Sequence, residues 1–587
     1  MDKRLFLAFA LSGAVVVLTP FLFQHQNVPP VATTPAVSAV TSTSGSLGAG
    51  AAPANAPATV SGLPAVPPTA ATGTLTGAAP GAAVPAAAET LTVTTAVSQT
   101  RFSTLGAAPL DVQLPGFRNL GATKGVVSIH QQFEPLLRYR LLAGRDTIDL
   151  ARVAFTATRT SGATSGATSG ATSGATSGAT SGATSGATSG QTVAFHGTSG
   201  ATDITLQYTM TDSNYLGTVS VTVHGAVAPA FLLVDLPTGF VSPESDTLGD
   251  MAALAYAVKP QRGNAKGVPF RKLDPGEQRL EAGPMFWAIA KNKYFVVALL
   301  APEKAPTIAE VKFEGGVRTG KMATRGKATA VLPLTDGATT FALYAGPQDW
   351  ERMRALGRSF EDANPYGGFM QPVVQPFATI VMRALLWMKR TTHLNYGWVL
   401  VIFGVVIRLL MWPLNQKAMR ASMKLQVLQP ELQALQAKYK SDPQKQQQEI
   451  MKLYNEHGMS PLSPLLGCLP MMLPMPILFA LFWVFGNTIE FRGVAFMWLP
   501  DISLKDPLYI LPLLMGVSMF VLSWIGMRNA PPNPQAKMMA YLMPAMMTFF
   551  FINFASGLNL YYTVQNLAAL PQQWLIAHER AKGKRSG

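Results

Sequence analysis

Arg408 is the residue most able to do chemistry, because it lies in an otherwise apolar setting. It interrupts the apolar run from Tyr396 to Trp412, within Val405-Val-Ile-Arg-Leu-Leu-Met411. An arginine at the centre of a membrane helix costs roughly 2.5 to 3.5 kcal/mol on insertion scales, so an arginine retained there is a candidate functional group. Two interpretations are open. The guanidinium extends to the cytoplasmic headgroups, or it faces a watery cavity inside a helical bundle and attracts anionic groups.

No other set of residues forms a catalytic or metal-binding pattern. His393, His457 and His578 lie at the edges of the apolar segments or outside them. The chain has no Gly-x-Ser-x-Gly elbow and no Gly-x-x-x-x-Gly-Lys nucleotide loop. Its single cysteine, Cys468, excludes a disulfide framework and a Cys-rich metal site. We therefore expect no catalytic residue, no metal and no cofactor.

The elements that position Arg408 are predicted to be membrane helices. The chain is 48% hydrophobic and 13% charged, whereas soluble domains carry about 25% charged residues. None of its long apolar segments contains Asp, Glu, Lys or His as a counter-charge for Arg408, and Pro413 is expected to end the segment that holds it. Six segments are long enough to cross a bilayer as helices: residues 5–23, 396–412, 464–485, 508–525, 538–554 and 558–576.

The distribution of the net charge of +15 predicts the topology. Basic residues dominate the segment 414–460 and the tail 581–587, whereas the loop 486–507 has charges of both signs. By the positive-inside rule, both termini and the segment 414–460 are cytoplasmic. The part between the first two spans is then exported.

The N-terminal hundred residues are predicted to be an anchor and a tether. Residues 1–23 join a basic start to an apolar run, and the lack of small residues after Phe23 favours an uncleaved anchor over a cleaved signal peptide. Residues 24–100 are mostly Ala, Pro, Thr and Gly, a composition typical of disorder. The Ser-Gly-Ala-Thr repeats at 161–190 have no bulky side chains to pack, so we expect a flexible insertion in a surface loop.

Residues 101–370 are predicted to form an all-β sandwich around that insertion. Apolar and polar residues alternate in Ile204–Met210 and Val219–Val223, and Gly, Pro and Asp-Gly turns separate such runs. Its histidines have no spacing that suggests a metal site or a triad, so we expect surface or hydrogen-bonded residues at His130, His196 and His224.

Residues 371–392 are predicted to form an amphipathic helix. Apolar residues recur at helical spacing, and the segment carries Trp387 and ends near Lys389-Arg390. Such a helix suits a membrane interface. The alternative is an ordinary packed helix.

The segment 414–460 is predicted to form a cytoplasmic helical hairpin. Asp442 before Pro443 is typical of a helix start, and Gly458 of a helix end. Two amphipathic helices outside the bilayer form a docking element, and the alternative is a solvated spacer. The apolar stripe of the first helix steps by three and four residues: Leu425, Leu428, Leu432, Leu435 and Tyr439.

At this point the sequence resembles a known family. Residues 365–580 resemble the core of YidC-type membrane protein insertases, and the layout resembles their Gram-negative form. The order and spacing of several short motifs support the match: Gly397-Trp398, Ile407-Arg408, Met411-Trp-Pro-Leu414, Leu428-Gln-Pro430, Ser463-Pro-Leu-Leu-Gly-Cys-Leu-Pro470, Met475-Pro-Ile477, Asp506-Pro507, Leu560-Tyr-Tyr562 and Gln572-Gln573. Gly404 and Pro474 depart from the family, which often has polar residues at these positions.

The resemblance implies a fold, a site and partners. Five of six spans surround a hydrophilic groove, and the β-domain is periplasmic. Arg408 supplies the groove's positive charge, while Met475, Leu478, Tyr562 and Gln565 are substrate-groove residues. The hairpin, through Lys417, Lys424, Leu428, Leu432 and Leu435, receives substrate from the cytoplasm.

The implied function is that of a membrane protein insertase and chaperone of the bacterial inner membrane, not an enzyme. Its expected partners are nascent membrane proteins, the lipid bilayer and the Sec translocon, with the ribosome and the signal recognition pathway as further candidates, and no specific nucleic acid. Two alternatives stay open: a secondary transporter of a small solute, and a sugar-binding or sugar-modifying role for the β-domain.

Overall fold

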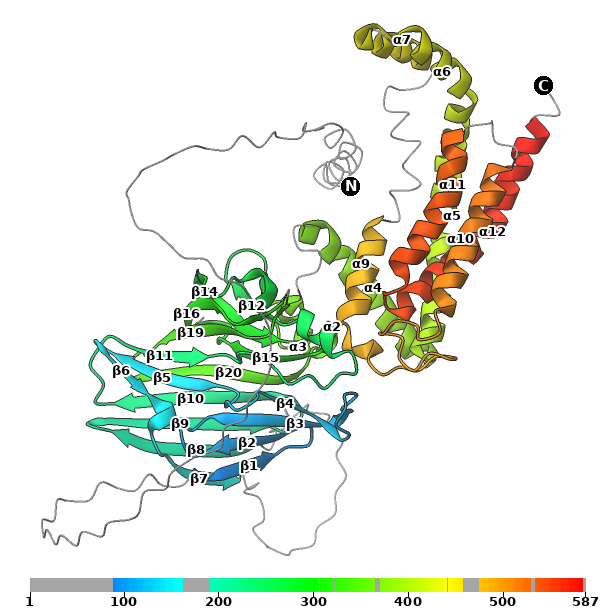
Figure 1. The fold of residues 1–587 in the computed structure, drawn as a ribbon. Coiled ribbons are helices and arrows are strands. Elements are labelled where there is room, and N and C mark those ends of the chain that lie inside the picture. Colours follow the sequence, from blue (N-terminus) through cyan, green and yellow to red (C-terminus); the bar gives the residue numbers. More distant parts are fainter. Residues whose placement is uncertain are drawn as a thin grey trace, which may run out of the picture. The chain divides into compact units, whose positions relative to one another are not determined.

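A computed structural model of the chain describes residues 88–161, 190–305, 307–320, 322–364, 370–440, 442–457, 475–528 and 534–583. These residues form a β-domain and a group of mostly apolar helices (Figure 1). The predicted anchor 1–23, the tether up to residue 87, the interior of the Ser-Gly-Ala-Thr insertion, Gly458, Cys468 and Pro474 lie outside the described residues.

The β-domain is built from two larger sheets and one small hairpin, and all pairings are antiparallel. The four-stranded sheet has the order β1(Thr90–Thr94), β2(Gln99–Ser103), β3(Pro109–Arg118), β4(Val126–His130). The fourteen-stranded sheet has the order β6(Asp146–Asp149), β5(Arg138–Ala143), β11(Ala230–Asp235), β19(Gly326–Pro333), β16(Ile308–Gly315), β14(Gln278–Lys291), β15(Phe295–Leu300), β20(Ala338–Pro347), β10(Leu216–His224), β9(Thr202–Thr211), β8(Gly190–Ser199), β7(Thr156–Ser161). On β14, a side branch adds β12(Ala255–Pro260) and β13(Lys266–Pro269). The hairpin pairs β17(Arg318–Thr319) with β18(Met322–Ala323).

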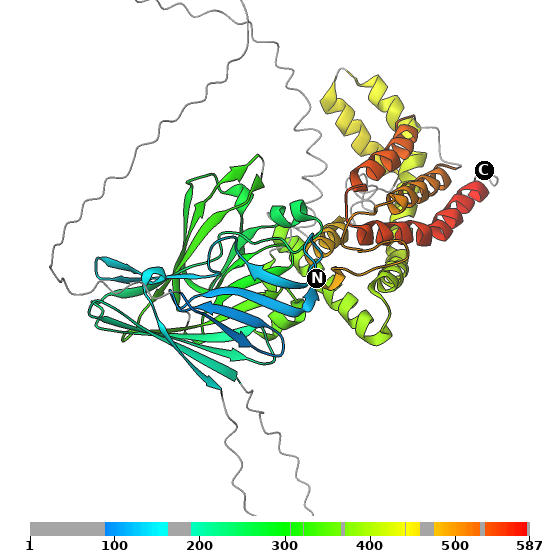
Figure 2. The same ribbon diagram turned by 60° about the horizontal axis from the view of Figure 1, so that its bottom comes forward.

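The two larger sheets pack face to face. The Phe102 ring on β2 lies 4.7 Å from the Tyr208 ring on β9 and 5.8 Å from the Phe195 ring on β8, measured between centroids. All three side chains are fully buried. Figures 1 and 2 show the four-stranded sheet lying over this part of the larger sheet. Strand β9 alternates buried and more exposed residues along its length, as the sequence pattern predicts. The prediction of an exported β-rich sandwich is therefore confirmed for its fold.

The boundary placed at residue 101 is wrong. Strand β1 begins at Thr90, inside the segment predicted to be a disordered tether. The run Thr-Leu-Thr-Val-Thr alternates apolar and β-branched polar residues, which suits a strand. Val93 is fully buried in the sandwich core, so this short strand gains enough apolar contact to be ordered.

The Ser-Gly-Ala-Thr repeats connect two strands that pair with each other. Strand β7 pairs with β8 in the register Thr156↔His196 to Ser161↔Gln191. The described ends of the insertion are therefore neighbours in one β-hairpin. An insertion at this place lengthens the loop of a hairpin and does not interrupt the pairing of β7 with β8.

The helical part begins with α4(Gln371–Thr392), which has the bounds that the sequence predicts. Its buried face includes Val374, Val381 and Leu385, whereas Trp387 is 66% exposed. The other longer helices are α5(Tyr396–Val427), α6(Gln429–Lys438), α7(Pro443–Glu456), α9(Met475–Asn487), α10(Ile510–Met527), α11(Pro534–Phe551) and α12(Ser556–Gly583). The short helices of the described chain are η1(Leu150–Arg152), α2(Thr247–Ala252), η2(Phe270–Lys272), α3(Trp350–Ala355), η3(Phe360–Ala363) and η5(Ile489–Phe491).

The prediction that Pro413 ends the second span is wrong. Helix α5 continues through Pro413 to Val427, so the span and the start of the predicted hairpin are one helix. A proline inside a helix removes one backbone hydrogen bond, but membrane helices tolerate this because neighbouring groups satisfy the freed backbone. The carbonyl that Pro413 leaves without its amide partner is that of Leu409, four residues earlier. Helix α12 packs beside α5 here, and the Gln572 side-chain amide donates to the neighbouring Trp412 carbonyl at 3.0 Å.

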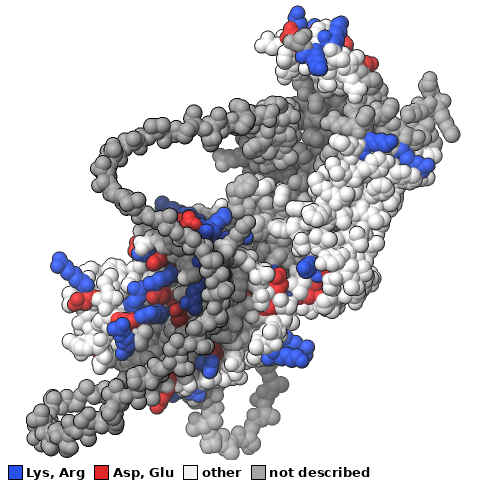
Figure 3. All heavy atoms as spheres, viewed as in Figure 1, with Lys and Arg blue, Asp and Glu red and all other residues white. Residues whose placement is uncertain are grey.

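Two of the described helices are long and apolar enough to cross a membrane: Tyr396–Gln416 and Ile510–Met527. Ile477–Asn487 and Ala540–Phe551 are apolar but shorter. Figure 3 shows that charged side chains gather on the β-domain and on the α6–α7 end, while the helical surface between them is mostly uncharged. By length and composition, the described residues therefore support two of the six predicted spans.

The loop between α9 and α10 is tied to the β-domain through buried polar contacts. Arg492 forms a 2.7 Å ion pair with Glu244, and both side chains are nearly inaccessible, at 5% and 6% exposure. The Tyr294 hydroxyl donates to the Ser503 hydroxyl at 3.0 Å. Partnered charges of this kind fix the orientation of the elements that carry them.

Candidate functional site

Arg408 lies on α5 and is half-buried, with α12 beside it. Its Nη2 donates a 2.9 Å hydrogen bond to Oε1 of Gln572 on α12. Its Nε is buried and has no hydrogen-bond partner among the described residues. A guanidinium has five N–H donors, so one neutral amide oxygen leaves most of its hydrogen-bonding capacity and all of its charge uncompensated.

Gln572 joins the two helices through both ends of its amide. Its oxygen accepts from Arg408, and its nitrogen donates to the Trp412 carbonyl one turn further along α5. The residue is 1% exposed. Sequence analysis missed this role, although the signal was present: Gln565 and Gln572 are seven residues apart, which places both on one helix face.

Gln565 makes the next contact along the same face of α12. Its side-chain amide donates to the Gly404 carbonyl at 2.9 Å and lies 3.0 Å from the Tyr561 hydroxyl. Gly404 lies one turn before Arg408 and is packed against Val564, which a Cβ at this position would approach to 3.1 Å. The glycine thus lets α12 come close, and its carbonyl adds polarity where a polar side chain was expected.

The other predicted groove residues lie in an apolar part of the bundle. Leu478 on α9 and Tyr562 on α12 are partly buried and pack against the same hydrophobic cluster. The Tyr562 ring contacts the Phe551 ring at 5.4 Å between centroids. Met475 is the first residue of α9, and its side chain lies outside the described residues. The structure therefore brings Gln565 close to Arg408 through Gly404, and gives Leu478 and Tyr562 apolar surroundings.

A second polar pair connects α12 to α10. Asn566 donates to the Ser518 hydroxyl at 3.1 Å and lies 3.4 Å from the Met515 carbonyl. Gly516 allows α10 and α11 to approach, because a Cβ there would meet the Thr548 side chain. Small residues and amide side chains at such contacts are typical of helix packing in membranes.

The predicted helical hairpin has its predicted turn. Asp442 caps α7 by accepting from the Lys445 amide at 3.1 Å, and Pro443 is the first helical residue. Leu428 and Leu453 are buried, and Leu432 and Leu435 are partly exposed. The backbone of Lys417 and Lys424 belongs to α5, while their side chains lie outside the described residues. The apolar stripe is thus only partly covered.

The described residues contain no cluster of three or more His, Cys, Asp or Glu side chains that suits a metal ion. The β-domain histidines lie apart: His130 contacts the Ser128 carbonyl, and His196 contacts the Thr205 hydroxyl. Both have the local hydrogen bonds that the sequence analysis expects.

Comparison with known proteins assigns both parts of the chain. Residues 90–380 match the family model "YidC periplasmic domain", and residues 387–584 match "60Kd inner membrane protein". A membrane protein insertase YidC of Anaeromyxobacter sp. (strain Fw109-5) is 31% identical over 65% of this chain and 68% of its own length. That of Chlorobaculum tepidum is 32% identical over 63% of this chain and 65% of its own length.

The alignments thus span about two thirds of the length of these relatives. A solved structure of an active YidC insertase with its first transmembrane domain resolved is 18% identical, covers 83% of this chain and 92% of its own, and has a TM-score of 0.33. The two family models cover the β-domain and the helical part in succession, and named relatives align with more than half of the chain. The chain belongs to the YidC family of membrane protein insertases.

Proposed function

We propose that this insertase receives nascent membrane proteins in a hydrophilic groove between α5 and α12 and releases their helices into the inner membrane. The observation that supports the proposal is the setting of Arg408. Its guanidinium is half-buried on an apolar helix, and its described partner is the neutral amide of Gln572. A positive charge kept without a counter-ion attracts an acidic group more strongly than one already paired.

The physical chemistry of the groove follows from that charge. A polar segment of a substrate faces a shorter apolar distance when part of the bilayer is replaced by a hydrated cavity. Arg408 holds an acidic tail transiently, because a charge pair at 4 Å is worth about 4 kcal/mol at an effective dielectric constant near 20. The substrate helix then enters lipid, and burial of its apolar surface at roughly 25 cal/mol per Å² drives release. No nucleotide is needed.

The topology belongs to the same proposal. Six spans include the N-terminal anchor, five of them surround the groove, and both termini are cytoplasmic while the β-domain is periplasmic. Two observations support it: the match of residues 90–380 to a periplasmic domain, and the basic residues of the 414–460 segment, which favour the cytoplasm. In this scheme the α6–α7 hairpin offers its partly covered stripe, with Leu432 and Leu435, to incoming substrate.

Substrate contacts are assigned by apolar character. Leu478 and Tyr562 supply apolar groups suited to a substrate helix, and Gln565 supplies a polar one. Met475, at the start of α9, is included for its apolar residue type. The Sec translocon, the ribosome and the signal recognition pathway are the partners we infer for delivery. The chain does no covalent chemistry in this mechanism, since Arg408 acts by electrostatic attraction. The transporter alternative has no support in the comparisons, which name insertases.

The test is insertion by the purified full chain in liposomes. The substrate is a single-span protein with an acidic N-terminal tail, and protection from added protease reports insertion. Liposomes without the insertase provide the control. We expect insertion well above this control for the native chain and a loss of at least severalfold for Arg408→Glu, which repels the tail. Equal insertion by native chain, Arg408→Glu and empty liposomes would overturn the proposal.

A further inference from the structure

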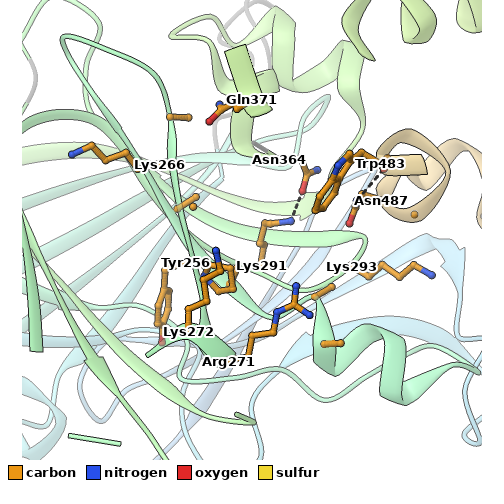
Figure 4. A pocket seen from close by; sticks show the side chains of 18 of the residues that line it. Tyr256, Lys266, Arg271, Lys272, Lys291, Lys293, Asn364, Gln371, Trp483 and Asn487 are labelled. Carbon is orange, nitrogen blue, oxygen red and sulfur yellow. Dashed lines mark hydrogen bonds between the residues drawn. The ribbon is translucent and has the colours of Figure 1, made fainter. Parts of the chain in front are cut away.

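A cavity of about 630 Å³ lies between the β-domain and the end of α9 (Figure 4). Strands β12 and β13 and the η2 turn form one side, and Phe482 and Trp483 of α9 contribute to the other. No Asp or Glu is among the described residues that line it. Five basic residues line it: Lys266, Arg271, Lys272, Lys291 and Lys293.

Most of this positive charge has no counter-ion. Lys266 forms a 2.6 Å ion pair with Glu281, and within the described part of the chain the other four basic residues make no ion pair. Arg271 and Lys272 are exposed and adjacent in sequence. Several basic groups that line one cavity, with no acidic residue among the lining, attract an anion that accepts several hydrogen bonds, such as a phosphate.

Lys291 is the buried member of this set. Its side chain is 7% exposed, and its ammonium donates to the neutral Oδ1 of Asn364. Figure 4 shows this contact beside Trp483, with Arg271 and Lys272 at the part of the cavity near Tyr256. Burial lowers the pKa of Lys291 to about 8. The buried Asp250 carboxylate attracts Lys291 through space without forming an ion pair with it. The buried ammonium is therefore only partly compensated, and a bound anion offsets the remaining cost.

The remaining wall favours an amphiphile over a small ion. Alanines of α2 and β12 and the rings of Phe482 and Trp483 make much of the lining apolar. The volume is within the range of about 300 to 1,000 Å³ that is usual for ligand pockets and far exceeds one phosphate ion. Trp483 belongs to an apolar helix in the part that matches an inner membrane protein, and the basic residues belong to the part that matches a periplasmic domain. Tryptophan is enriched where membrane meets water.

We propose that this cavity binds the phosphate-containing headgroup of an anionic phospholipid from the periplasmic leaflet. Arg271, Lys272 and Lys291 contact the phosphate, while Phe482 and Trp483 contact the glycerol and the first acyl carbons. The site fixes the β-domain to the membrane surface beside α9. The proposal rests on the placement of the two matched regions and does not require the groove around Arg408.

The test uses the full chain in nanodiscs and a photoactivatable phosphatidylglycerol whose reactive group sits near the headgroup. Mass spectrometry then identifies labelled peptides, and unlabelled lipids compete for the site. We expect adducts within residues 249–272 or 482–487, displaced by phosphatidylglycerol and not by phosphatidylcholine. Removing both exposed charges in Arg271→Gln/Lys272→Gln is expected to weaken labelling roughly tenfold to thirtyfold.

A matched control separates this site from general surface charge. Lys312→Gln/Lys327→Gln removes two exposed basic residues of the same domain, on β16 and β19, which do not line the cavity. Its labelling is expected to equal that of the native chain, and the thermal unfolding of both double variants should match it too. Equal loss in the control, equal competition by phosphatidylcholine, or displacement by millimolar inorganic phosphate or an acidic peptide alone would each overturn the lipid assignment.

Discussion

Replacing Gln572 by glutamate tests whether the uncompensated charge of Arg408 is what an acidic substrate uses. The two side chains have nearly the same shape, so the carboxylate would take the place of the amide oxygen that lies 2.9 Å from Nη2 of Arg408. The variant then carries an internal ion pair where the native chain has a charge and a neutral partner. We expect the groove to lose its attraction for an acidic tail while the helix packing persists.

The size of the effect follows from that distance. Two unit charges 2.9 Å apart attract by about 6 kcal/mol at an effective dielectric constant near 20. Desolvation of the second charge cancels several kcal/mol of this. The glutamate also cannot donate to the Trp412 carbonyl, which costs about 0.5 to 1.5 kcal/mol. A net pairing of about 2 kcal/mol remains, so an acidic tail must compete against it at a disadvantage of roughly thirtyfold.

The assay compares two single-span substrates that differ only in the charge of the N-terminal tail. Insertion into proteoliposomes is measured by protease protection at limiting insertase. Gln572→Glu should lower insertion of the acidic-tail substrate by roughly tenfold to thirtyfold and that of the neutral-tail substrate by less than about twofold. Gln573→Glu is the matched control, because it adds the same charge one residue later, where the side chain lies against Gly526 of α10.

Two results would refute the reasoning. An equal loss for both substrates means that Gln572 serves packing and not the electrostatics of the groove. No loss for either means that the charge of Arg408 is not what the acidic tail contacts. Gln572→Leu gives an independent check on packing, since it removes both hydrogen bonds and is expected to lower thermal stability more than Gln572→Glu does.

Four further predictions concern stability, read as thermal unfolding of the detergent-solubilised chain. Burial raises the pKa of Glu490 to about 8, so the folded chain binds its proton more tightly than the unfolded chain, and stability falls as pH rises from about 4.5 to 8. Glu490→Gln should abolish this fall in stability, and the variant should be more stable than the native chain at pH 8 by on the order of 2 to 4 kcal/mol, with no difference at pH 4. The same pH dependence of thermal unfolding in the variant and the native chain would contradict this prediction. Asp506→Ala should cost about 2 to 4 kcal/mol, since the fully buried carboxylate accepts from two backbone amides at the start of α10; an unchanged midpoint would exclude a capping role. Glu244→Gln should cost about 3 to 5 kcal/mol by leaving Arg492 buried and unpaired, and Glu244→Gln/Arg492→Met should recover at least half; no recovery would mean that the charge pairing is not the cause. Deleting residues 164–187 should stabilise the chain by about 1.5 kcal/mol, because it shortens the connection between the paired residues Ser161 and Gln191 about sixfold and still leaves enough residues for a turn; destabilisation would show that the repeats pack.

Local patterns predicted much of the fold because the physics that determines them is local. The amphipathic spacing of 371–392 predicts a helix with the bounds of α4, and Asp442 before Pro443 predicts the start of α7. The alternation in 204–210 predicts a strand with one buried face, as β9 has. In each case a few neighbouring residues determine the backbone conformation.

The errors have the opposite origin. Pro413 predicts a helix end from local geometry, but the helix continues to Val427 and packs against α12 along this stretch. The strand β1 is too short and too polar to stand out from the tether, and its order comes from pairing with β2. Contacts between distant segments override local preference at both places.

The candidate site was predictable in part. Arg408 stands out by its charge in an apolar run, and the resemblance to the family adds Gln565. The pairing of Arg408 with Gln572 joins positions far apart in the sequence, and one sequence gives no direct sign of which polar residue on α12 faces α5. Arg492 and Glu244 are also far apart in the sequence. From the sequence alone, Arg492 contributes only to the mixed charge of the loop 486–507.

The buried charges of the helical part differ between its two ends, and the difference favours a groove that opens on one side. Near the start of α10, Asp501 and Asp506 accept hydrogen bonds from surrounding backbone and side chains, and Arg492 has Glu244. These three charges are satisfied by the protein, and burial raises the pKa of nearby Glu490 to about 8, so that carboxyl is mostly uncharged at neutral pH. Arg408 lies twelve residues after the start of α5, about 18 Å along the helix at 1.5 Å per residue, and among the described residues its hydrogen-bond partner is the neutral Gln572. A charge at this depth is tolerable only if water or a polar substrate reaches it. Since Asp501, Asp506 and Arg492 at the other end already have partners and Glu490 is mostly uncharged there, access from the side of the α6–α7 hairpin is the arrangement that costs least free energy.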